Sequence, residues 1–102
     1  STQVDDLVSR FFSYLSIERK KNCNISNKVR KMNEIIDETQ ILIGKTPSAI
    51  TSSCIYYVLT MEGIEIQKKY LSQQLNVSVV TINKIYQVLK TNSHLFDEIC
   101  SP

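Results

Sequence analysis

Glycine and proline, the residues that punctuate tight turns, are nearly absent from this chain of 102 residues, which contains two of each. Long blocks of helix-compatible residues lie between them. A β-sandwich or β-barrel needs many more tight turns, so the sequence favours helices throughout. A chain of this length has room for one hydrophobic core, and its 42% of hydrophobic residues is ordinary for a globular protein. We therefore expect a single all-α domain spanning residues 1–102.

Apolar residues recur at intervals of three and four in five segments. This spacing predicts helices over residues 3–16, 26–42, 47–61, 65–75 and 79–91. Boundary signals agree with these limits, because Thr2 and Asp5 have the spacing of a capping box and Pro47 suits the first position of a helix. Gly44 and Gly63 are placed to end the second and third helices.

Each predicted helix has an apolar face that we expect to be buried. The expected core positions of the first three helices are Val4, Val8, Phe11 and Leu15, then Val29, Met32, Ile36 and Ile43, then Ile50, Cys54, Tyr57, Val58 and Met61. The third helix also carries small residues near its start, so we expect it at the centre of the bundle. Residues 18–24 are expected to be a polar, basic connection, and residues 93–102 a C-terminal tail with a last turn against the core.

Side chains that support catalysis or metal binding are few and scattered. Cys23, Cys54 and Cys100 are widely spaced and form no CxxC pair, which argues against a zinc site or a disulfide framework and fits a reducing compartment. His94 is the only histidine, and no glycine-rich nucleotide loop is present. We expect no catalytic, cofactor or metal site, and no run of apolar residues approaches the length that a membrane-spanning helix needs.

The last two predicted helices match the pattern of a helix-turn-helix, with Asn76 and Ser78 in the turn between them. The apolar positions that would pack the pair are Leu71, Leu75, Val77, Ile82, Ile85 and Leu89. In such a motif the start of the second helix enters the major groove of DNA. The candidates for contacts with bases are Val79, Val80, Thr81, Asn83 and Lys84. The alternative is that this is an ordinary helical hairpin, since any small bundle contains two helices joined by a short turn.

Three blocks of the sequence resemble the transcription factor IIB family. Residues 6–15 (DLVSRFFSYL) are similar to the start of its second cyclin-like repeat. Residues 45–50 (KTPSAI), followed by Ile55 and Tyr56, resemble its signature at the third helix. Residues 80–82 (VTI), with Tyr86 following, resemble the start of its recognition helix. The blocks occur in the family's order and at nearly its spacing.

The resemblance implies a five-helix cyclin-like bundle with a helix-turn-helix in its last two main helices. It also implies a general transcription initiation factor that binds double-stranded promoter DNA beside the TATA element, together with the TATA-binding protein and RNA polymerase. Val80 and Thr81 match the family's recognition helix, whereas Asn83 stands where members commonly have arginine. Arginine pairs with guanine and asparagine with adenine, so A/T-rich flanking DNA is the expected target.

A second set of residues is expected to contact DNA phosphates. Lys45, Thr46 and Ser48 surround the predicted start of the third helix, where free N–H groups and the helix dipole favour an anion. Lys68 and Ser78 are the other phosphate candidates. Such contacts position a protein on DNA without reading its sequence. The simpler interpretation of Thr46 is that it caps the helix and nothing more.

Other interpretations of the chain remain open. The related RNA polymerase III initiation factor has similar repeats, and a cyclin-like domain can also bind a protein partner without contacting DNA. By resemblance, a zinc ribbon and a first repeat are expected elsewhere in the factor, so we expect this domain to be excised from a longer chain and monomeric by itself. A nuclear location follows, or a cytoplasmic viral factory if the source is a large DNA virus.

Overall fold

The computed structural model describes residues 6–10 and 19–100 of the chain. Residues 6–10 are helical, and five helices and a 3-10 turn follow them. Their bounds are α2 Arg19–Thr39, α3 Pro47–Met61, α4 Lys68–Leu75, α5 Val79–Thr91, η1 Ser93–Phe96 and α6 Asp97–Cys100. The described residues contain no strand, as the sequence predicts.

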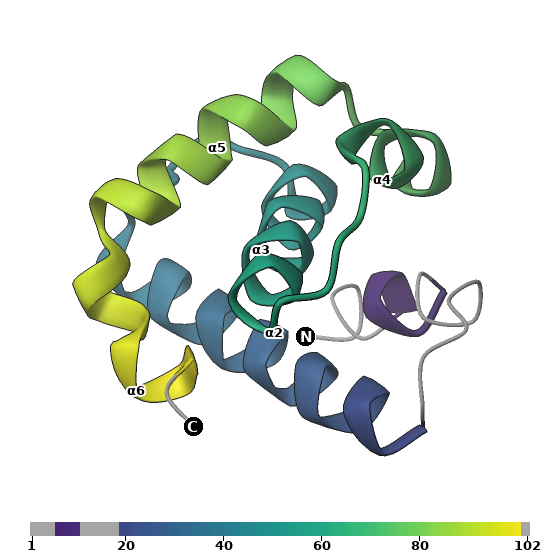
Figure 1. The fold of residues 1–102 in the computed structure, drawn as a ribbon. Coiled ribbons are helices and arrows are strands. Elements are labelled where there is room, and N and C mark those ends of the chain that lie inside the picture. Colours follow the sequence, from purple (N-terminus) through teal and green to yellow (C-terminus); the bar gives the residue numbers. More distant parts are fainter. Residues whose placement is uncertain (1–5, 11–18, 101–102) are drawn as a thin grey trace.

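Helix α3 lies at the centre of the bundle, between α2 and α5, and α4 lies to one side (Figure 1). It begins as predicted, because the Thr46 hydroxyl accepts the Ala49 N–H at 3.2 Å and Pro47 follows the cap. Buried residues occur on every side of α3, which confirms its central position. Met61 is an exception: it was expected in the core, yet it is 56% exposed, because the last residue of α3 projects beyond the helices that cover the rest.

Helix α2 begins earlier than the sequence predicts. Residues 19–24 are helical, so the expectation of a basic connection is wrong for these residues. Residue 18, the first of the expected connection, lies outside the described residues. The reason is Ile25, which is buried and extends the stripe of Val29, Met32 and Ile36 one turn toward the N-terminus. No glycine or proline interrupts residues 19–39, so the helix continues across the polar segment.

The end of α2 also differs from the expectation. The helix stops at Thr39, and Gln40 adopts a left-handed conformation with φ of 58°. This change breaks the helical register, so Leu42 is buried and Ile43 is 77% exposed. The expectation that Ile43 belongs to the core is therefore wrong. Gly44, with φ of 83°, lies in the turn before α3 instead of directly after a helix.

The segment between α3 and α4 is extended. Gly63 has φ of 75°, and residues 64–67 form no helix, so α4 starts at Lys68 and not at Glu65 as expected. Ile64 and Ile66 are half-buried against the core, whereas Glu65 is exposed between them. This alternation with a period of two is the pattern of an extended chain, in which successive side chains point to opposite sides.

Residues 93–100 form η1 and α6 and fold back on the bundle, as expected for this part of the C-terminal tail. Phe96 is fully buried, and its ring centroid lies 5.8 Å from that of Tyr57 on α3. An ion pair between Lys28 and Glu62 joins α2 to the end of α3. At the other end of the chain Leu7 and Val8 are buried, while Val4, Phe11, Leu15 and the Thr2–Asp5 capping box lie outside the described residues.

Candidate nucleic-acid interface

Helices α4 and α5 are joined by a three-residue turn with the geometry of a helix-turn-helix. Asn76 ends α4 in the left-handed conformation, with φ of 55° and ψ of 47°. Asparagine adopts this conformation more readily than most residues do. Val77 is buried beneath the turn, and the Ser78 hydroxyl accepts the Thr81 N–H at 3.1 Å to cap α5. Asn76 and Ser78 therefore both lie in the turn, as the sequence predicts.

A single apolar stripe fixes the two helices against the core. All six residues predicted to pack the motif are buried: Leu71, Leu75, Val77, Ile82, Ile85 and Leu89. On α5 the buried residues share one side of the helix, because they follow one another at intervals of three and four. The opposite side of α5 consequently faces away from the bundle.

The residues predicted to read bases lie on or beside this outward side. Val80 is 62% exposed and Lys84 is also exposed, while Val79, Thr81 and Asn83 are half-buried. The Ser78 hydroxyl donates to that of Thr81 at 2.8 Å, so these two hydroxyls belong to the helix cap. The start of α5 thus projects from the fold with two exposed side chains, as insertion into a groove requires.

Charge is strongly segregated along the chain. All ten acidic residues lie outside residues 66–96, a stretch that holds four lysines and includes both helices of the motif. The formal net charge of +2 conceals this local excess of positive charge. A surface with one sign of charge attracts a polyanion and raises its rate of association. The helix-turn-helix is therefore electrostatically suited to a nucleic acid.

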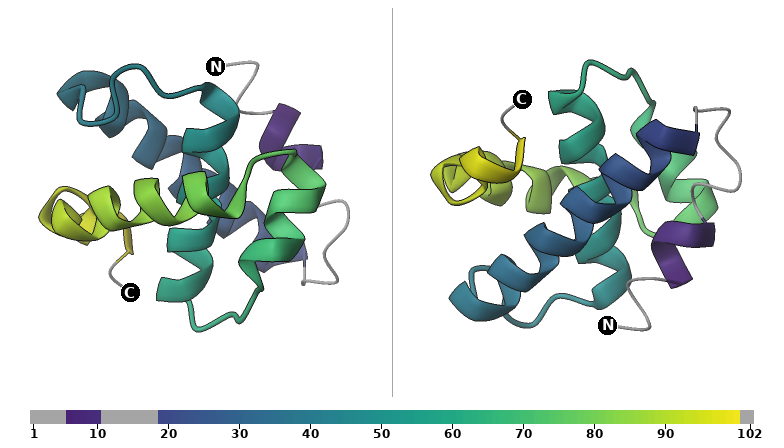
Figure 2. Two further views of the ribbon diagram at one scale, coloured as in Figure 1. Left: turned by 90° about the horizontal axis from the view of Figure 1, so that it is seen from above. Right: turned by 90° about the horizontal axis from the view of Figure 1, so that it is seen from below.

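The other phosphate candidates lie at the starts of α3 and α4. Lys45 and Thr46 are exposed before α3, and Ser48 is half-buried in its first turn. Helix α3 crosses beneath α5, so that the start of α3 lies on one side of α5 and the start of α4 on the other (Figure 2). The structure thus places the phosphate candidates at the start of α3 on one side of the projecting helix and Lys68, at the start of α4, on the other.

Lys68 has a more specific environment than the sequence indicates. Its ammonium nitrogen lies 5.0 Å from the ring centroid of Tyr56 and 5.7 Å from that of Tyr86. The two rings meet edge to face, with their centroids 4.9 Å apart. Lys90 approaches the same Tyr86 ring at 5.6 Å. Sequence reasoning missed this cluster because its members come from three helices, and only the Tyr86–Lys90 spacing of four residues signals a contact.

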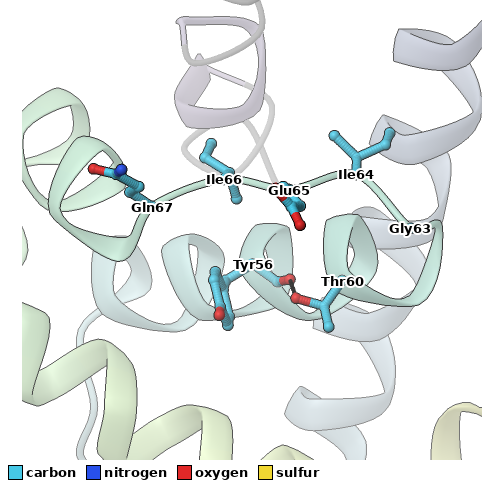
Figure 3. A pocket seen from close by; sticks show the side chains of 7 residues that line it. All are labelled: Tyr56, Thr60, Gly63, Ile64, Glu65, Ile66 and Gln67. Carbon is cyan, nitrogen blue, oxygen red and sulfur yellow. Dashed lines mark hydrogen bonds between the residues drawn. The ribbon is translucent and has the colours of Figure 1, made fainter.

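An open groove of about 630 Å³ lies between α3 and the extended segment that precedes α4. Tyr56 and Thr60 line it from α3, and Glu65 projects toward them from the extended segment (Figure 3). The other lining residues are Gly63, Ile64, Ile66 and Gln67. None of the residues predicted to contact DNA lines this groove.

The three titratable groups with altered pKa values lie away from the helix-turn-helix surface, two in the core and one half-buried on α6. Burial raises the pKa of the Cys54 thiol, and it also raises the pKa values of Tyr57 and Cys100. Cys54 therefore remains a protonated, apolar core residue.

His94 is exposed on η1. In the described residues, no three His, Cys, Asp or Glu side chains are grouped so that they could hold a metal ion. No helix within that part of the chain has the length and apolar character needed to cross a bilayer.

Comparison with protein-family models gives one match, to the transcription factor TFIIB repeat, over residues 2–92. The matched range contains the three blocks of resemblance and the whole helix-turn-helix. No curated protein and no solved structure gave a match. The family's cyclin-like repeat is all-α, in agreement with the bundle described above. We conclude that the chain belongs to the TFIIB repeat family and is a domain of a transcription initiation factor.

Proposed function

We propose that this domain binds double-stranded promoter DNA by inserting the start of α5 into the major groove. The observation that carries the proposal is the projecting, capped start of α5 within a stretch of 31 residues, 66–96, that has lysines but no acidic residue. A groove about 12 Å wide accommodates a helix. The domain acts by binding and not by catalysis.

The side chains at the start of α5 favour contacts with A·T pairs. Val80 presents methyl groups that can pack against the methyl group of thymine. Asn83, on the flank of the helix, can pair with adenine. Lys84 is exposed and can reach either a base edge or a phosphate. We therefore propose an A/T-rich element as the target.

A second group of contacts would hold the phosphate backbone on the side of α5 where α3 begins. The Thr46 hydroxyl accepts the Ala49 N–H, which leaves its own proton free to be donated to a phosphate oxygen. Lys45 adds a positive charge, and Ser48 adds a hydroxyl in the first turn of α3. These contacts would fix the register of the protein on the duplex.

Within the transcription machinery, we propose that the chain acts as the second repeat of a IIB-like factor. It would bind beside the TATA element with the TATA-binding protein and help to recruit RNA polymerase. Affinity from a single module is expected to be modest and sensitive to salt. Tethering to companion domains would raise the effective concentration at the promoter.

The proposal is tested by titrating an A/T-rich duplex with the wild type and with the triple variant Val80→Ala, Asn83→Ala, Lys84→Ala. We expect affinity to fall at least tenfold, because the loss of one bidentate contact such as that proposed for Asn83 costs about 1–3 kcal/mol and the other two contacts are lost with it. A matched control is Lys31→Ala together with Glu34→Ala on the exposed face of α2, which leaves the net charge unchanged.

The same titration separates the competing interpretations. Duplex binding that survives the triple change would show that α5 is not the recognition helix. A wild type that fails to bind duplex even at low salt would favour the cyclin-like protein-interaction domain. For the start of α3, Lys45→Ala with Thr46→Ala is expected to reduce the salt dependence of binding, and an unchanged dependence would remove that contact from the proposal.

A further inference from the structure

Two lysines from different helices converge on one tyrosine ring. Lys68, at the first position of α4, and Lys90, near the end of α5, have their ammonium nitrogens 5.7 Å and 5.6 Å from the centroid of Tyr86. Tyr56 of α3 supports the arrangement, because its ring contacts both Tyr86 and Lys68. The side chains of three helices therefore hold two positive charges around one aromatic ring.

No acidic side chain in the described part of the chain pairs with either ammonium group. The absence of acidic residues from positions 66–96 extends well beyond this cluster. The tyrosine rings attract the cations through their quadrupoles, but they carry no net charge and do not cancel the repulsion between the two lysines. The cluster therefore favours an anion within reach of Lys68 and Lys90.

The start of α4 adds to the same positive field. Lys68 and Lys69 occupy its first two positions, no acidic residue lies in its first turn, and Gln67 provides no side-chain cap. Cations at the amino end of a helix oppose its dipole and are unfavourable unless an anion is bound. The start of α4 therefore strengthens the positive field near the lysine pair and favours an anion there. By itself it would not define a binding site.

The cluster lies on the same flank of α5 as Asn83. Val79, Asn83, Tyr86 and Lys90 follow one another at intervals of four, three and four, which places them in one row along the helix. Tyr86 is seven residues from Val79, or about 10 Å along the helix axis. The major groove is about 12 Å wide, so a strand bordering the groove passes within reach of the cluster when bases meet the start of α5.

From this geometry we infer that Lys68 and Lys90, positioned by Tyr86 and Tyr56, form a binding site for a phosphate of the DNA strand that borders the groove on the α4 side. The site rests on the proposed function, to which it adds a second anchor. The start of α3 lies on the opposite side of α5 (Figure 2), where it would face the other strand. The projecting helix would thus be held by phosphate contacts on both of its sides.

The experiment measures duplex affinity against salt concentration for the wild type, Lys68→Gln, Lys90→Gln and the double variant. Each lost phosphate contact reduces the magnitude of the negative slope of log K against log salt by about 0.9. The double variant should therefore have a slope smaller in magnitude by about 2. Lys31→Gln is the matched control, because it removes an equal charge from α2, on the far side of α3 from α5 (Figure 1). It should keep the wild-type slope.

Two ring variants test the positioning role. Tyr86→Phe keeps an aromatic face for both lysines and should keep the wild-type affinity. Tyr86→Leu removes that face, so affinity should fall severalfold while the salt slope, which counts charges, stays within about 0.5 of wild type. Thermal unfolding of each variant, followed by circular dichroism, shows whether the fold survives. Titrations are made below the unfolding transition of the least stable variant.

The inference is overturned if the double variant keeps the wild-type slope while the wild type binds duplex, and the proposed function then stands without this anchor. It is also overturned if Lys31→Gln lowers the slope as much as the loss of either cluster lysine, since the effect would then be one of net charge. A wild type that does not bind duplex at low salt removes both proposals. If the cluster instead binds an acidic protein, the double variant binds duplex with the wild-type slope, which is the first of these results.

Discussion

Helices α3 and α5 cross at the centre of the molecule, yet they are constrained in opposite ways. Nine of the fifteen residues of α3 are buried, compared with three of the thirteen residues of α5, so α5 has much the larger surface free for another role. On α3, the Ser52 and Ser53 hydroxyls donate to the carbonyls of Ser48 and Ala49, which satisfies them within the helix. Packing therefore constrains side chains on all sides of α3 but only one stripe of α5.

The largest difference should come from truncating side chains in the two helices. Leu59→Ala leaves a cavity at a fully buried position of α3 and should lower the free energy of unfolding by about 2–5 kcal/mol. Lys84→Ala on the exposed side of α5 should change it by less than about 0.5 kcal/mol. Urea unfolding followed by circular dichroism measures both. Equal effects would mean that α5 also packs on its outward side.

Enlarging a side chain tests the same contrast in the other direction. Ser52→Leu adds volume in the close-packed first half of α3 and should destabilise the domain by about 1–3 kcal/mol. Gln87→Leu makes a comparable change on the exposed side of α5 and should be nearly neutral in a thermal melt. A tolerated leucine at position 52 would contradict the close approach of neighbouring helices to α3.

Thr51 offers a test in which the buried helix becomes more stable. Its hydroxyl oxygen is buried and has no hydrogen-bond partner in the described structure. An unsatisfied buried polar atom costs about 1–3 kcal/mol, so Thr51→Val should raise the midpoint of urea unfolding. The corresponding change on α5, Thr81→Val, removes a hydroxyl that accepts from Ser78 and should lower it. A loss of stability in Thr51→Val would indicate a bound water or another partner for the hydroxyl.

The smallest expected effect depends on pH. Burial raises the pKa of Cys54 above its value in the unfolded chain, so the thiol contributes stability below the unfolded pKa and loses it as the pH rises above that value. With an unfolded pKa of about 8.5, this loss is about 1 kcal/mol at pH 9. Cys54→Ala should therefore show a weaker fall in stability between pH 7 and pH 9 than wild type. Cys23→Ala, at an exposed position, should show the wild-type fall.

The contrast between the helices also explains what the sequence could predict. Helix α5 and the turn before it follow from local signals, since Asn76, Ser78 and the apolar spacing each act within a few residues. The bounds of α2 and the exposure of Ile43 were not predicted correctly, because the buried Ile25 extends the helix through a polar segment and the left-handed Gln40 ends it early. The exposure of Met61 depends on where the neighbouring helices end. The cluster of Lys68 and Lys90 around Tyr86 requires the relative placement of three helices, which apolar periodicity does not contain.

Asn76 has a consequence for how such a domain can be adjusted. This left-handed residue begins the three-residue turn from α4 to α5, so it contributes, with the buried stripe, to the angle at which the projecting helix leaves the bundle. The side chains of α5 determine which chemical groups it meets there. Angle and chemistry are thus encoded at separate positions, and either can be altered by substitution while the other is retained.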